Sequence, residues 1–295
     1  MKMNYVSKIK ANMLRYKSIY TTTATSRILD GSYNSIYKGR SMNFDELREY
    51  IPGDDIKDID WKATSRKQKI MIRQHIAEKK HNVLLVMDTN RRMLADTEGL
   101  EEKREVAIMS TGTLACLVNS NGDYVSAIYP TEKSMQFFPF RIGLPNIENI
   151  LNSYHKEVTL QNCSELNSSL EYIAKHIHRR LILFIISDLQ GISRLSESTL
   201  RQLLLHQDVL VININDAKMA GKKVYSIENH DYVPAFISES RRLSKIEDQK
   251  QTELFRVCED KLKRNGVAMV SIGSTDEIDT QLISLLEKHK LEKRK

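Results

Sequence analysis

The chain has 295 residues, 41% of them hydrophobic and 28% charged, and a formal net charge of +7. This composition is typical of a globular protein with a hydrophobic core and excludes a wholly disordered chain. The 3 cysteines are isolated and lack Cys-x-x-Cys spacing, which argues against a disulfide framework or structural zinc site and predicts a cytoplasmic protein.

Residues 1–81 are predicted to form an N-terminal extension. Its first segment, of about 20 residues, is basic and has helical periodicity. A Thr-rich connector is expected to follow at Thr21–Thr25. Basic residues interrupt the apolar ones in this first segment, so it lacks the features of a secretory signal peptide. Too few apolar residues recur at regular spacing to form a core, and we expect the extension to pack on the body that follows.

The most informative stretch lies within this extension, at residues 39–66. Pro52 and Gly53 suit the central positions of a type II turn, because proline fixes the first φ and glycine allows a positive second φ. The carboxylates that follow alternate with basic side chains, which predicts a charge-paired network around a large anchor, Trp61. We interpret the segment as a structural clasp that holds the extension to the body, with a direct ligand site as the alternative. The clasp residues are Arg48, Tyr50, Pro52, Gly53, Asp54, Asp55, Asp60, Trp61 and Arg66.

From residue 82 onward, short β-branched runs alternate with amphipathic stretches, which predicts an open, mostly parallel sheet with helices on both faces. The predicted strands are Val83–Met87, Tyr124–Tyr129, Leu181–Ile186, Val209–Ile214 and Val267–Ile272, with an edge strand at Ser134–Phe138. The predicted helices are Lys103–Asn119, Ser164–Arg179, Glu197–His206, Leu243–Arg264 and Asp276–His289. The longest apolar run, at 181–186, is far shorter than the roughly 20 residues that cross a bilayer, so no membrane span is expected.

Several of these pieces together resemble a known family. The matching residues are Phe44, Leu47, Arg48, Tyr50, Pro52–Asp55, Ile59–Trp61, Arg66, Asp88, Ser164–Leu166, Ser187, Asp188, Asn265–Val267, Thr275 and Asp276. They resemble the bacterial domain-of-unknown-function family fifty-eight, whose members carry a von Willebrand factor A-like domain and are typically encoded beside MoxR-type AAA+ ATPases. The resemblance covers about residues 35–290. Its first block is specific, because a Pro-Gly-Asp-Asp turn followed by Ile-Asp-Trp is improbable by chance.

The resemblance implies a von Willebrand A-like, Rossmann-type α/β domain at residues 82–295. In such open sheets ligands bind beyond the carboxyl ends of the strands. The von Willebrand A domain places its metal-ion-dependent adhesion site there, with an Asp-x-Ser-x-Ser loop, a Thr and an Asp. The corresponding residues in this chain, which we expect to form a partner-binding rim, are Asp88, Asn90, Arg92, Ser164 and Asp188.

This adhesion site is degenerate, because Asn90 and Arg92 stand where the von Willebrand A domain has serines. Arginine is never a metal ligand, and a guanidinium repels a divalent cation. We therefore expect no cofactor, with Arg92 in the metal's place and paired with Asp88 and Asp188. If a Mg²⁺ site were retained, its ligands would be Asp88, Asn90, Ser164 and Asp188. The plain alternative is that the two aspartates cap helices or pair with lysines.

The sequence has no nucleophile elbow, Walker loop or dinucleotide fingerprint, which argues against an enzyme. We predict a non-enzymatic protein-protein interaction module. The resemblance implies an adaptor or co-chaperone-like partner of a MoxR-type AAA+ ATPase with an unknown client. One alternative is a divergent phosphohydrolase using Asp88, although Asn90 stands where the general acid is needed. The other is a weak nucleic-acid binder that uses the basic termini of the chain.

Overall fold

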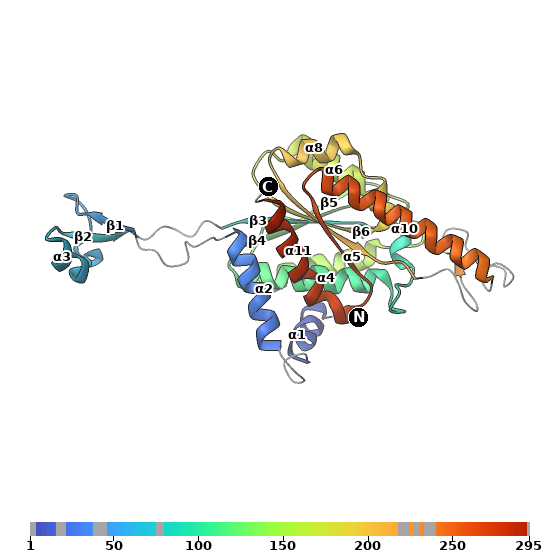
Figure 1. The fold of residues 1–295 in the computed structure, drawn as a ribbon, viewed down its shortest axis with the longest axis horizontal. Coiled ribbons are helices and arrows are strands. Elements are labelled where there is room, and N and C mark those ends of the chain that lie inside the picture. Colours follow the sequence, from blue (N-terminus) through green and yellow to red (C-terminus); the bar gives the residue numbers. More distant parts are fainter. Residues whose placement is uncertain are drawn as a thin grey trace. The chain divides into compact units, whose positions relative to one another are not determined.

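The computed structural model describes residues 4–15, 22–37, 46–74, 80–217, 225–226, 231–232 and 240–293 (Figure 1). The chain divides into two compact units, residues 1–32 with 81–295 and residues 33–80. The first 32 residues therefore group with the α/β domain, whereas the expected division placed all of residues 1–81 in one extension.

The α/β domain is built on a six-stranded sheet in the order β10-β7-β6-β3-β4-β5. Counted along the chain, this is the order 3-2-1-4-5-6 of doubly wound sheets. All neighbours pair in parallel except β5, which runs antiparallel to β4 at one edge. The strands are β3 (Asn82–Met87), β4 (Tyr124–Pro130), β5 (Met135–Phe137), β6 (Ile182–Asp188), β7 (Asp208–Ile214) and β10 (Ala268–Ile272). The predicted fold class, an α/β domain with an open, mostly parallel sheet, is confirmed.

Helices cover both faces of this sheet (Figure 1). One face carries α1 (Tyr5–Arg15), α4 (Lys103–Ser120), α5 (Leu144–Glu157) and α11 (Ile278–Glu292). The other carries α6 (Leu166–His176), α7 (Leu189–Ser193), α8 (Glu197–Leu204) and α10 (Arg241–Arg264). The predicted helices are present, whereas α5 and the short α7 were not predicted. In the described part of the chain, no helix combines the length and apolar character that crossing a bilayer requires.

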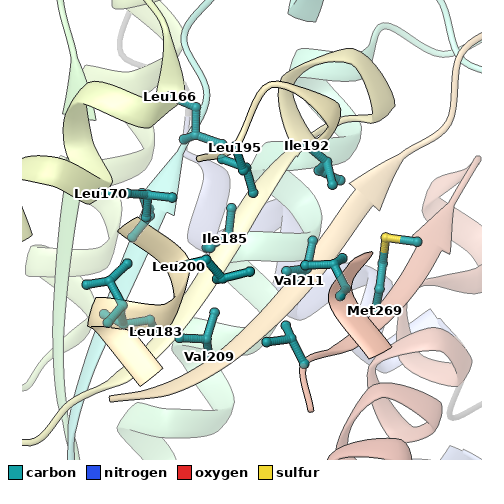
Figure 2. Close-up of a cluster of buried hydrophobic side chains, with 14 of the residues drawn as sticks. Leu166, Leu170, Leu183, Ile185, Ile192, Leu195, Leu200, Val209, Val211 and Met269 are labelled. Atoms are coloured by element: carbon teal, nitrogen blue, oxygen red, sulfur yellow. The ribbon is translucent and has the colours of Figure 1, made fainter. Parts of the chain in front are cut away.

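The central strands are buried on both sides, as a parallel sheet between two helical layers requires. Every residue of β6 is buried. Figure 2 shows the cluster on one face, where Leu183 and Ile185 of β6 and Val209 and Val211 of β7 meet side chains from the covering helices. The uniformly apolar run predicted this central position correctly.

The expected connector at Thr21–Thr25 is wrong from Thr22 onward, because α2 spans Thr22–Tyr37; Thr21 lies outside the described residues. Threonine has a modest helix propensity, which tertiary contacts readily override. Such contacts occur further along α2, where Leu29 is buried and the Asn121 side chain donates a hydrogen bond to Asp30 at 3.4 Å.

Helix α1 is docked on α4 and α5 through both apolar and polar contacts. Tyr5 and Ile9 are fully buried. The Glu148 carboxylate accepts hydrogen bonds from the backbone N–H groups of Tyr5 at 3.0 Å and Val6 at 2.7 Å, as a capping residue would. A Cβ on Gly112 of α4 would overlap Ile9 Cδ1 and lie 3.0 Å from Leu151 Cδ1, so this glycine permits the close approach.

The unit of residues 33–80 holds an antiparallel pair of strands and two short helices. They are β1 (Glu46–Glu49), β2 (Met71–Gln74), the 3₁₀ helix η3 (Ile56–Asp58) and α3 (Trp61–Lys67). Its buried apolar side chains include Met71 and Ile72. Backbone pairing and local capping, described below, hold this small unit together.

We predict that Gly112→Ala lowers the free energy of unfolding by about 1–3 kcal/mol, because its Cβ must displace buried Ile9. The matched control is Gly31→Ala in α2, where a Cβ meets nothing within 4 Å; it should be neutral or stabilising by up to about 1 kcal/mol. Urea unfolding followed by circular dichroism measures both. Equal effects of the two substitutions would contradict the close packing of α1 on α4.

Candidate functional site

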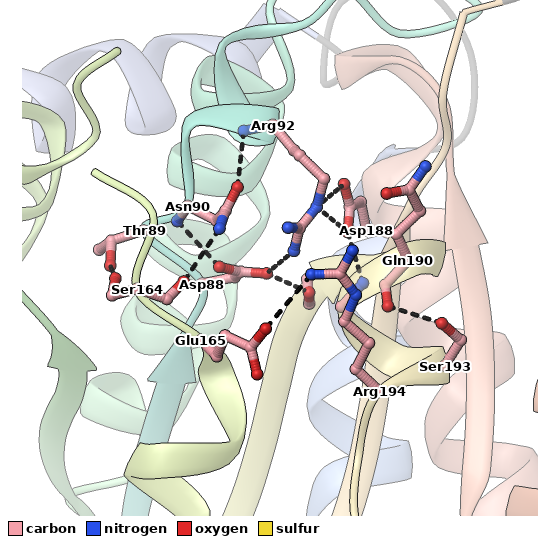
Figure 3. Close-up of polar contacts among 12 residues, drawn as sticks. Asp88, Thr89, Asn90, Arg92, Ser164, Glu165, Asp188, Gln190, Ser193 and Arg194 are labelled. Atoms are coloured by element: carbon pink, nitrogen blue, oxygen red, sulfur yellow. Dashed lines mark hydrogen bonds and ion pairs between the residues drawn. The ribbon is translucent and has the colours of Figure 1, made fainter. Parts of the chain in front are cut away.

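The carboxyl ends of β3 and β6 bring the predicted rim residues together (Figure 3). β3 pairs with β4 on one side and β6 on the other, so the chain reverses its direction across the sheet at this point. Such a switch point is where open α/β sheets bind ligands. Asp88 follows β3 and Asp188 ends β6, while Ser164 lies in the loop before α6.

Asp88 is fully buried, and both of its carboxylate oxygens are engaged. Oδ2 accepts the Ser187 hydroxyl at 2.6 Å and Arg92 Nη2 at 3.4 Å, and Oδ1 accepts the Asn90 backbone N–H at 2.9 Å. Burial, followed by the charge of Asp188, raises the pKa of Asp88 above its usual range. The hydrogen bonds and burial of Asp88 do not favour a nucleophilic role.

Asp188 has the opposite electrostatic character. Burial alone would raise its pKa, but Lys103 and Arg92 outweigh burial and hold the pKa of Asp188 below its usual range. Lys103 Nζ lies 3.3 Å and Arg92 Nε 3.2 Å from Asp188 Oδ2. Asp188 also caps α7, since its Oδ1 accepts the Gly191 N–H at 2.8 Å.

Arg92 makes the two ion pairs expected from the sequence. It lies in the 3₁₀ helix η4 (Arg91–Leu94), where the Asn90 side chain accepts the Arg92 backbone N–H at 3.1 Å. Its side chain is only 8% exposed and extends between Asp88 and Asp188 (Figure 3). The degenerate position therefore carries a buried cation that bridges the two aspartates.

The sequence analysis missed Lys103, which is 1% exposed and pairs with both Asp188 and Asp216. The helical periodicity of the sequence could have identified Lys103 as a buried residue. Lys103 stands at helical spacing from buried Val106 and Ala107, on the face of α4 that packs into the domain. A lysine on a buried helical face requires an acidic partner. We call Asp88, Arg92, Lys103, Asp188 and Asp216 the ion cluster.

The residues present do not fit the divalent cation that the fold family implies. Arg92 and Lys103 supply two positive charges between the carboxylates that would have to bind the metal. The other two implied ligands hold loops together instead, because the Asn90 amide donates to the Ser164 carbonyl at 3.0 Å and the Ser164 hydroxyl donates to Asn162 at 2.5 Å. Cationic side chains in this place oppose Mg²⁺ binding.

Exposed side chains surround the ion cluster at the rim. Cys163, Glu165, Gln190 and Arg194 are all exposed, and Arg194 Nη1 lies 3.3 Å from Glu165 Oε1 (Figure 3). We call these four residues the rim surface. A partner approaching this edge would contact them before the buried aspartates.

The signature residues of the clasp lie in the unit of residues 33–80. The predicted type II turn is present, since Gly53 has a φ of 113° and the Asp54 N–H donates to the Ile51 carbonyl at 3.1 Å. Asp55 caps η3 and Asp60 caps α3 by accepting backbone N–H groups. The turn and the caps account for Pro52, Gly53 and the three aspartates of this segment.

The prediction that Trp61 anchors the segment is wrong. Its side chain is 67% exposed and Arg66 is exposed as well, while Tyr50 is partly buried. Trp61 is the first residue of α3, whose residues are all exposed or partly exposed. The clasp side chain of Arg48 lies outside the described residues, although its backbone belongs to β1.

We predict that Arg92→Met or Lys103→Met lowers the free energy of unfolding by about 3–5 kcal/mol, because each removes a buried cation that pairs with two carboxylates. The control is Lys69→Met, whose ion pair with Glu49 is solvent-exposed on both sides; it should change stability by about 0–1 kcal/mol. Urea unfolding measures all three variants. Similar losses for the buried and exposed pairs would contradict the proposed importance of the ion cluster.

We also predict that Asp188→Asn costs about 3 kcal/mol at pH 7 and that Asp88→Asn costs less. The lowered pKa of Asp188 means that its charge stabilises the fold above about pH 4 and that this contribution disappears as pH falls through the folded pKa. The raised pKa of Asp88 means that ionisation opposes folding as pH rises. Unfolding at pH 7 and pH 3.5 tests this, and a deficit of Asp188→Asn that does not shrink in acid would contradict it.

Comparison with known proteins gives distant relatives. Uncharacterized proteins of Mycobacterium bovis and Mycobacterium tuberculosis are 25% identical to this chain over 196 residues, which are 65% of this chain. The chain spans 60% of the length of these curated relatives.

Solved structures similar to this chain include a conserved hypothetical protein, BatB, from Bacteroides thetaiotaomicron, with 12% identity, a TM-score of 0.42 and coverage of 73% of this chain and 100% of that one. A von Willebrand factor type A protein from Catenulispora acidiphila has 7% identity, a TM-score of 0.38 and coverage of 72% and 43%. The family described as "Protein of unknown function DUF58" matches residues 46–221, more than half of the chain. The chain therefore belongs to the DUF58 family.

Proposed function

We propose that this protein is a non-enzymatic, cytoplasmic protein-binding module that serves a MoxR-type AAA+ ATPase as an adaptor or co-chaperone-like partner and recognises an unidentified client. The resemblance of the signature segment to proteins encoded beside such ATPases supports the choice of partner. The observation that carries the binding role is the ion cluster. At the edge where such sheets bind ligands, the chain's own cations lie between the aspartates.

The rim surface is the part of this edge that a partner would contact. Arg194 and Glu165 have side chains that are 51% and 59% exposed. An ion pair this exposed contributes about 0–1 kcal/mol, so Arg194 can exchange Glu165 for a carboxylate of the partner at little cost. Arg92 is too buried for this role and acts as a positioning residue that fixes the loops beneath the rim surface.

We propose that the partner binds without a metal or another cofactor. A metal-dependent adhesion site uses its cation to hold a partner carboxylate, and Arg194 offers a guanidinium for the same purpose. Calorimetric titration of the protein with Mg²⁺ and with Mn²⁺ should give no saturable heat. Saturable binding that disappears in an Asp188→Ala variant would contradict this part of the proposal.

The partner is tested by affinity purification of the tagged protein from its own cells, with ATP and Mg²⁺ present, followed by mass spectrometry. We expect a near-stoichiometric AAA+ ATPase. Arg194→Glu should reduce its recovery at least tenfold, because the change places a carboxylate where the partner's carboxylate binds. Lys175→Glu is the matched control, since Lys175 is also exposed but lies on α6 outside the rim surface.

Results that contradict the proposal differ in what they contradict. Recovery of the ATPase that Arg194→Glu leaves unchanged would contradict the rim surface while keeping the partner. The absence of any AAA+ ATPase, or turnover of phosphate esters by the purified protein, would contradict the adaptor role.

A further inference from the structure

Four large apolar side chains are exposed within a short stretch of the unit of residues 33–80. Trp61 is 67% exposed, Ile56 68%, Ile51 60% and Ile70 46%. Single exposed apolar residues are ordinary, but several gathered together mark an interaction site. We call these four residues the Trp61 surface.

Backbone hydrogen bonds join the segments that carry these side chains. The Tyr50 N–H donates to the Ile70 carbonyl at 2.9 Å, and the Asp60 N–H donates to the Met71 carbonyl at 2.8 Å. The residues that precede Ile51 and Trp61 are therefore bonded to adjacent residues of one strand segment. Ile56 belongs to the same arrangement, because its carbonyl accepts the Ile59 N–H at 3.3 Å and Ile59 forms a bridge with Ile72.

The charges around the Trp61 surface are arranged unevenly. Exposed basic side chains follow the apolar ones closely, at Lys57, Lys62, Arg66 and Lys67. The nearby carboxylates Asp54, Asp55 and Asp60 instead accept backbone N–H groups at the turn and at the two helix starts. Within the described residues, no ion pair engages these four cations. The cations are thus available to an external acidic group.

From this arrangement we infer that the Trp61 surface is a docking site for a partner protein whose own surface offers an apolar pocket bordered by carboxylates. Tryptophan and arginine are enriched among the residues that dominate protein interfaces. The indole of Trp61 enters the pocket, and Lys62 and Arg66, which follow it in α3, pair with the bordering carboxylates. This site uses other residues than the rim surface and does not depend on the proposed ATPase.

A lipid surface suits these residues less well than a protein. Binding in the plane of a membrane usually uses a continuous amphipathic helix, whereas α3 has only 7 residues. The isoleucines lie at the turn, in η3 and directly before β2. Asp54 and Asp55 lie between Ile51 and Ile56, and an anionic membrane would repel both carboxylates. A protein pocket accommodates mixed charge at its border.

The first experiment uses the fact that Trp61 is the only tryptophan in the sequence. The fluorescence of the full-length protein should show the red-shifted emission of an indole in water and complete quenching by acrylamide. Neither should change with protein concentration or on addition of vesicles of phosphatidylcholine and phosphatidylglycerol at 3:1. Blue-shifted emission from the free protein would mean that the chain itself or a second copy covers Trp61. That result, or a blue shift with vesicles, would overturn the inference.

The second experiment identifies the partner. A photo-crosslinking amino acid is placed in the full chain at Trp61, and separately at Leu205, a control that is 75% exposed in the α/β domain. We expect one protein to be crosslinked in cells from position 61 and not from position 205, at a site bordered by Asp or Glu. No adduct, or adducts with lipid or with a second copy only, would overturn the inference.

The crosslinked protein is then purified and titrated against the full chain while Trp61 emission is followed. The expected result is a saturable blue shift whose affinity falls at least tenfold in a Lys62→Glu, Arg66→Glu double variant. Lys175→Glu and Arg194→Glu should leave this affinity unchanged. Both of these single variants should unfold like the parent protein. An affinity that is unaffected by the double variant would overturn the inference, whereas failure of the rim surface alone would not.

Discussion

Two buried cations among three carboxylates constrain the edge of the α/β domain at which the carboxyl ends of the parallel strands lie. Arg92 and Lys103 are 8% and 1% exposed, and a charge buried to this degree costs several kcal/mol, about 3–5, when its partner is removed. Their carboxylate partners come from the ends of different strands, since Asp88 follows β3, Asp188 ends β6 and Asp216 follows β7. Lys103 therefore links the ends of β6 and β7 to the first turn of α4, and Arg92 links the ends of β3 and β6 to η4.

The same network determines local backbone structure. Asp188 caps α7 through Gly191, and a Cβ on Gly191 would overlap Ser187 Oγ and lie 2.6 Å from Asp88 Oδ2. Asn90 accepts the Arg92 N–H and begins η4. Asp188 and Asn90 thus fix the backbone around the ion cluster. The site therefore has a defined shape although its residues do not suit a metal.

Hydrophobic periodicity predicted most of the fold, because strand and helix periods are local properties of the sequence. The run at 181–186 identified the central strand β6, and turn chemistry identified the edge strand β5. Local patterns failed where tertiary contacts decided the outcome: Leu29 and Asp30 stabilise α2 despite its threonines. The ion pairs of Arg92 with Asp88 and Asp188 followed from the resemblance. Lys103 was missed because its partners are 85 or more residues away along the chain.

Trp61 shows a second limit of the sequence, because a lone tryptophan among paired charges suggested an anchor and only the structure shows that its side chain is exposed. The helix α1 has a further consequence, which concerns synthesis of the protein. Its N-terminal N–H groups are capped by Glu148, which lies 143 and 142 residues further along the chain. Contacts of such high sequence separation form late and slow folding. During translation α1 must therefore leave the ribosome and wait, with Tyr5 and Ile9 exposed to solvent and to chaperones, until α4 and α5 have been made.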